Sequence, residues 1–160
     1  MQQNDNFADY GKMAQSSCGS IHDIEHFVKV WAYAKTIGEL ESLDSKTQFI
    51  LEAAAITHDI ACPLCRAKYG NAGGKLQEKE SPSLIRDFFA DTDLDETQVQ
   101  RLVWLVSHHH TYENIDGPDW QILIEADYIV KYSPCQGQSN LTPWKTAANH
   151  GRLQMPAIGG

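Results

Sequence analysis

Six of the seven histidines fall in three clusters whose side chains could bind a metal ion. His22 and His26 are four residues apart, a spacing that stacks two imidazoles on one face of a helix. His58 is directly followed by Asp59, and residues 108–110 are three consecutive histidines. Imidazole with carboxylate suits Fe, Mn, Zn or Co, and carboxylate also suits Mg. Each cluster also has an explanation without a metal. His22 and His26 could lie on an exposed helix face, and Asp59 could be a helix cap. The three consecutive histidines could lie at a helix C-terminus, where the helix dipole favours a positive charge.

A fourth feature is Asp127, which lies in the apolar segment ILIEADYIV. A carboxylate is costly to bury unless it is paired or bound to a metal. Asp127 is expected to be the inward-facing acid of this segment, with Glu125 on another face. A salt bridge to Lys or Arg is the competing explanation.

The elements that would position these residues are helices. Apolar residues recur with the helical period, β-branched alternation is scarce, and the pattern predicts an all-α single-domain bundle of five or six helices. Ser20, Asp44 and Asp95 are expected to begin three of them, and Pro82 to lie in the first turn of another. The expected helices are 20–38, 44–59, one from Pro82, 95–110 and 119–132, with a short sixth near Trp144. Residues 66–79 are predicted to form a loop.

The expected organisation is an N-terminal segment (1–19), a metal-binding helical domain (20–132) and a mostly irregular tail (133–160). The net charge of −8 disfavours a nucleic acid polymer as partner. No apolar run approaches about 18 residues, so no membrane span is expected. The absence of an export signal makes the cytoplasm the expected compartment and disulfides unexpected. Cys62 and Cys65 form a lone CxxC, which we interpret as packed or semi-exposed thiols. A homo-oligomer is compatible with the sequence.

The order His26, His58-Asp59, Asp127, each on a separate expected helix, resembles the HD-domain superfamily of metal-dependent phosphohydrolases. The contexts HFVKVWAYAKTIGE, AAAITHDIA and ILIEADYIV carry the resemblance, which covers roughly residues 20–132. It implies that these four residues hold a first divalent ion. It also implies that His58 and Asp59 are catalytic, with Asp59 or a neighbouring carboxylate accepting the proton of a metal-activated water.

The resemblance to members with two ions is partial. His108 and His109 resemble the later histidine pair of such members, and His22 falls where some of them place an extra ligand. The earlier histidine is absent, and Glu80 or Glu78 could replace it. The set His22, Glu80, His108 and His109 is therefore the hypothesis for a second ion.

The function that the resemblance implies is hydrolysis of a phosphate ester or anhydride in a small molecule, with a nucleotide as the leading class. Lys68 and Lys75 are expected to bind the substrate phosphate. One or two divalent ions are expected, and the sequence does not distinguish Fe, Mn, Zn, Co, Ni and Mg. Two alternatives stay open: a di-iron oxygenase of HD type, and a non-catalytic HD module that senses a ligand.

Overall fold

The computed structural model describes residues 7–17 and 19–132, and within these ranges the chain is built from helices with no strand. This confirms the predicted all-α class. The predictions for the tail 133–160 lie outside the described residues. The helices are α1 (Phe7–Ser16), α2 (Ile21–Leu40), α3 (Ser45–Thr57), α4 (Cys62–Tyr69), α5 (Gly74–Phe88), α6 (Glu96–His108) and α7 (Pro118–Tyr132).

Three helices begin at the capping residues that the sequence indicates. The Ser20 hydroxyl accepts a hydrogen bond from a backbone N–H in the first turn of α2. The Asp44 carboxylate accepts two backbone N–H groups of α3, at 3.0 and 3.1 Å. Asp95 and Gln98 form a reciprocal capping box at the start of α6. Each cap satisfies donors that would otherwise lack a partner at a helix N-terminus.

The prediction of a loop over residues 66–79 is wrong. Helix α4 continues to Tyr69, Gly70 ends it with a left-handed backbone at φ 75°, and α5 begins at Gly74. Pro63 lies in the first turn of α4, where a missing N–H costs nothing. The polar composition of this stretch reflects two short helices with exposed faces.

Pro82 lies inside α5 and not in its first turn as predicted. A proline within a helix removes one backbone hydrogen bond, so tertiary contacts must hold the helix together. Residues Gln77, Ser81, Ile85 and Phe88 are buried along one face of α5. Helix α1 was also not predicted.

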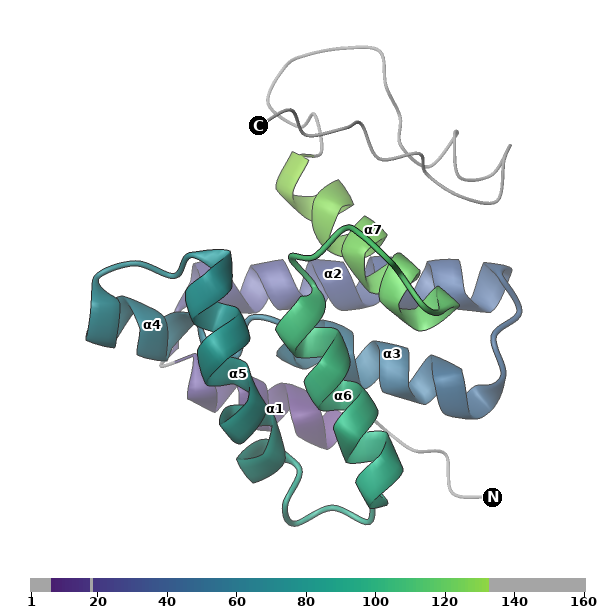
Figure 1. Ribbon diagram of the computed structural model, residues 1–160, viewed down its shortest axis with the longest axis horizontal. Helices are drawn as coiled ribbons and strands as arrows, with labels where there is room; N and C mark the ends of the chain where they lie inside the picture. The colour runs from purple at the N-terminus through teal and green to yellow at the C-terminus, as the bar shows by residue number, and fades with distance from the viewer. Residues whose placement is uncertain (1–6, 18, 133–160) are drawn as a thin grey trace.

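Helix α3 is the centre of the bundle. It contacts α1, α2, α6 and α7, and Figure 1 shows α2 beside it and α6 crossing it. Every residue from Ile50 to Thr57 is buried. Three consecutive alanines, residues 53–55, let neighbouring helices approach closely from all sides. The C-terminus of α3 therefore ends deep inside the molecule, which places the residues that follow it in the interior.

None of the described helices combines the length and apolar character that a membrane crossing requires.

Candidate metal centre

Four side chains from three helices converge at the C-terminal end of α3. His26 comes from α2, Asp127 from α7, and His58 and Asp59 directly follow α3. The Nε2 atom of His26 lies 3.1 Å from His58 Nε2, 3.1 Å from Asp127 Oδ1 and 3.3 Å from Asp59 Oδ2. His58 Nε2 lies 3.4 Å from Asp59 Oδ2 and 3.5 Å from Asp127 Oδ1.

These separations fit the ligand shell of a cation. Ligand atoms about 2.0–2.2 Å from an ion are themselves about 3.0–3.5 Å apart when the coordination is octahedral or tetrahedral. Two imidazole nitrogens and two carboxylate oxygens are also ligands that divalent transition metals accept. Two lone pairs facing each other, as on His26 and His58, require a proton or a cation between them. The residues present therefore fit a metal ion.

The tautomer of His58 is set by its backbone contact. Its Nδ1 lies 2.7 Å from the carbonyl oxygen of Ala55, and a carbonyl can only accept. Nδ1 therefore carries a proton, and in the neutral ring Nε2 presents its lone pair toward the centre. The ring is fully buried, so its orientation is also fixed by packing.

A second cluster adjoins the first through Asp59. The donor atoms of Asp59, His109 and His110 lie within 4.8 Å of one another, and Asp59 Oδ1 is 3.5 Å from His109 Nε2. Asp59 Oδ1, His109 Nε2 and His110 Nε2 are buried, and none has a hydrogen-bond partner among the described residues. Buried polar atoms normally have partners, so three such atoms at one place fit a second ion.

Local contacts hold both histidines of this second cluster. His109 Nδ1 donates to the carbonyl oxygen of Val106 at 2.6 Å, which leaves Nε2 as the lone pair. The His110 ring packs against the backbone of Gly74 at the start of α5. A Cβ at position 74 would lie 3.1–3.2 Å from three atoms of the His110 side chain, so glycine permits the close approach.

The electrostatics of the centre favour a protonated His58 beside ionised Asp59 and Asp127 carboxylates. Burial alone lowers the pKa of His58, but Asp59 and Asp127 outweigh it and raise that pKa to about 10. Burial alone raises the pKa of both carboxylates, but the histidines around them hold each pKa well below its usual value. Both acids are therefore ionised at neutral pH. Burial, with His109 nearby, lowers the pKa of His110 to about 3, so that ring is neutral.

The two carboxylate oxygens of Asp127 face different partners. Its Oδ1 faces His26 and His58, and its Oδ2 accepts a hydrogen bond from Lys131 at 2.6 Å. The salt bridge weighed against metal binding is thus present beside the ligand cluster and does not replace it. Lys131 is one turn after Asp127 on α7.

Two residues expected near a second ion lie elsewhere. The His108 ring stacks on Trp104 at 3.8 Å between centroids, and His110, not His108, accompanies His109 in the second cluster. Glu80 accepts hydrogen bonds from Tyr69 and, at 2.9 Å, from Lys68. Those bonds occupy both Glu80 and Lys68 away from the donor clusters.

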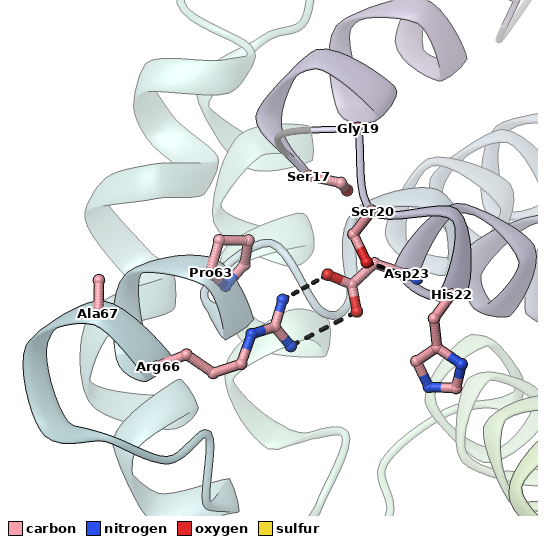
Figure 2. Close-up of a pocket in the computed structure, with 8 residues that line it drawn as sticks. All are labelled: Ser17, Gly19, Ser20, His22, Asp23, Pro63, Arg66 and Ala67. Carbon is pink, nitrogen blue, oxygen red and sulfur yellow. Dashed lines mark hydrogen bonds and ion pairs between the residues drawn. The ribbon is translucent and has the colours of Figure 1, made fainter.

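His22 is exposed and belongs to neither donor cluster. It lines an open cleft between the start of α2 and helix α4. In Figure 2, Arg66 of α4 reaches Asp23 of α2 across this cleft, and the His22 ring points away from the ion pair. Lys75 is also exposed. The structure therefore gathers His26, His58, Asp59, Asp127 and His109, and leaves His22 and Lys75 outside.

Cys62 and Cys65 are buried at the start of α4. Burial raises the pKa of both thiols, and the nearby Asp59 carboxylate raises that of Cys62 further. Neither sulfur belongs to a group of potential metal ligands among the described residues. Both are packed, protonated thiols, as interpreted from the sequence.

Comparison with known proteins shows the family. The sequence model of the HD domain family matches residues 23–139, which is more than half of the chain. The chain therefore belongs to the HD domain family. No curated protein and no solved structure matches it. HD domains are typical of metal-dependent hydrolases and bind divalent metals, and the His/Asp clusters described above could hold such an ion.

Proposed function

We propose that this HD-domain chain is a metal-dependent phosphohydrolase that cleaves a phosphate ester or anhydride of a small molecule, with a nucleotide as the first class to test. The observation that carries the proposal is the convergence of two imidazoles and two carboxylates: His26 Nε2 and His58 Nε2 lie 3.1 Å apart, and each lies 3.1–3.5 Å from an oxygen of Asp59 and an oxygen of Asp127. Nothing in the packing of a helical bundle requires two imidazoles and two carboxylates at one buried point.

The four residues would hold one divalent ion. Such an ion, when bound, lowers the pKa of a bound water and stabilises negative charge on a phosphoryl oxygen. The protein orients that chemistry with rigid groups: His58 is fixed by Ala55, and Asp127 is fixed by Lys131. Asp59 offers a second oxygen, Oδ1, that has no hydrogen-bond partner among the described residues. In a centre with a single ion, this oxygen would accept the proton of the attacking water.

His58 and Asp59 have different roles in this scheme. The His58 ring is fully buried, so it serves as a ligand that cannot exchange protons directly with solvent. The Asp59 side chain is 21% exposed, more than that of the other three ligands, so it would be the ligand nearest to water and substrate.

The second cluster favours a centre with two ions, because Asp59 belongs to both donor groups. In such a centre its Oδ1 would be a ligand of the second ion and not the proton acceptor. A pair of irons in the same positions would suit the oxygenase alternative, because the donor set itself does not select the reaction. An activity assay distinguishes the two reactions. A phosphohydrolase releases phosphate with a metal ion that is not oxidised, whereas a di-iron oxygenase consumes oxygen. A non-catalytic module would show neither.

The test uses protein purified without chelators, with Asp59→Ala as the variant and His108→Gln as the control. We expect bound metal in the wild-type protein, phosphate release from at least one member of a panel of phosphorylated metabolites, and loss of both in Asp59→Ala. The far-ultraviolet circular dichroism of the variant should keep its helical signal. An unchanged metal content in Asp59→Ala would refute the site, and oxygen consumption without phosphate release would refute the reaction.

A further inference from the structure

The groups around the two donor clusters differ in their access to solvent. His58 and His109 are essentially buried, and the Asp127 side chain is 4% exposed. The side chains of His26 and Asp59 are 15% and 21% exposed, and that of Lys131 is 33% exposed. The groups of the centre that solvent reaches are therefore His26, Asp59 and Lys131.

Lys131 contacts the centre directly and has donors to spare. Its Nζ donates to Asp127 Oδ2 at 2.6 Å, while Asp127 Oδ1 faces the two histidines. An ammonium group has three N–H donors, and no other hydrogen bond of Lys131 occurs within the described part of the chain. The remaining donors can serve a bound ligand without breaking the contact with Asp127.

Other cations near the centre are engaged elsewhere. Arg66 pairs with Asp23, and Lys68 pairs with Glu80. Across residues 7–17 and 19–132, the one Lys or Arg with an ion pair to a residue of the donor clusters is Lys131.

The net charge of the centre explains how Lys131 could help to bind an anionic ligand. In the first cluster, one divalent ion held by the carboxylates of Asp59 and Asp127 and by two neutral imidazoles leaves no net charge. A phosphoryl group is anionic, and the chain as a whole carries a net charge of −8. Lys131 restores a positive charge at a part of the centre that solvent reaches, and a charge-assisted hydrogen bond to an anion is stronger than a neutral one.

We propose that Lys131 binds a phosphoryl oxygen of the substrate beside the metal ion. This inference rests on the proposed function and deepens it: the substrate must present an anionic group with two or more oxygens, one toward the ion and one toward Lys131. It replaces Lys68 and Lys75 as the phosphate-binding residues. A role limited to orienting Asp127 is the competing explanation.

The experiment measures binding of inorganic phosphate to the Mn²⁺-loaded protein by calorimetry, together with metal content by elemental analysis. The variants are Lys131→Met and Lys131→Arg, with Lys46→Met, an exposed lysine on α3, as the matched control. Loss of a hydrogen bond from a charged group should weaken phosphate binding about tenfold or more in Lys131→Met. Metal content should stay at the wild-type value, and Lys131→Arg and the control should bind phosphate within about threefold of wild type.

Three results would overturn the inference. Phosphate binding by Lys131→Met at the wild-type affinity would show that the ammonium group does not contact the ligand. A parallel loss of metal from Lys131→Met would assign Lys131 to orienting Asp127. Absence of phosphate binding in the metal-loaded wild-type protein would refute the proposed function itself, whatever the variants do.

Discussion

Binding of a divalent ion should displace one proton from the centre. In the metal-free protein, the carboxylates Asp59 and Asp127 overcome the effect of burial and raise the pKa of His58 to about 10. Because Nδ1 of His58 donates to Ala55, the additional proton resides on Nε2, the atom that faces the other ligands. A protonated nitrogen has no lone pair to offer, so the ion and the proton compete for the same atom.

The sign and size of the effect follow from that competition. At pH 7 the proton is bound, about three pH units below the pKa, so it opposes metal binding by a factor of about 10³, or about 4 kcal/mol. Affinity should rise about tenfold for each unit of pH between 6.5 and 8.5. It should stop rising only near the pKa of His58, where the proton is lost without the metal.

The assay is calorimetric titration with Mn²⁺ in two buffers of different ionisation enthalpy, which counts the protons released. We expect about one proton per ion at pH 7. The variant His108→Gln should release the same number, because His108 stacks on Trp104 outside the centre. A proton count near zero, with an affinity that does not change between pH 6.5 and 8.5, would show that His58 is neutral before the ion binds.

Two further predictions concern the second cluster and the support of α7. Replacing His109 and His110 together with alanine should lower the metal content by about one ion per chain, measured by elemental analysis; an unchanged ratio would leave their buried nitrogens without a role. Arg101→Met should lower the free energy of unfolding by about 1–3 kcal/mol in urea, because it leaves the buried Asp119 unpaired. The exposed ion pair between Arg86 and Glu96 serves as the comparison. Arg86→Met should lower the free energy of unfolding by at most about 1 kcal/mol.

The sequence predicted the helices that carry strong local signals. Ser20, Asp44 and Asp95 have side chains that accept N–H groups of their own first turns, so their effect depends on a few adjacent residues. Helix α4 and the first half of α5 lack a continuous apolar stripe. They form because α5 packs against α6 and α4 packs against α5, contacts that no local pattern contains.

The residues of the candidate site also fall into those that the sequence selects and those that depend on tertiary geometry. His26, His58, Asp59 and Asp127 were selected because residue type, order along the chain and context matched a family. The choice between His108 and His110 depended on the angle at which α6 ends, and adjacent helical residues point about 100° apart. A single lysine one turn after an aspartate is a common surface pair, so the sequence alone does not select Lys131 as a contact of the centre.

One local signal does distinguish the buried histidines, and it is shared by two helices. His58 and His109 are each the C-cap residue of their helix, α3 and α6, and each donates Nδ1–H to the carbonyl three residues earlier. The last carbonyls of a helix lack partners within it, so a buried C-terminus needs a donor there. An imidazole that supplies this donor must then turn its other nitrogen, with a lone pair, away from the helix. Where two such helix ends meet beside carboxylates, the capping that completes the fold also presents ligands to a cation.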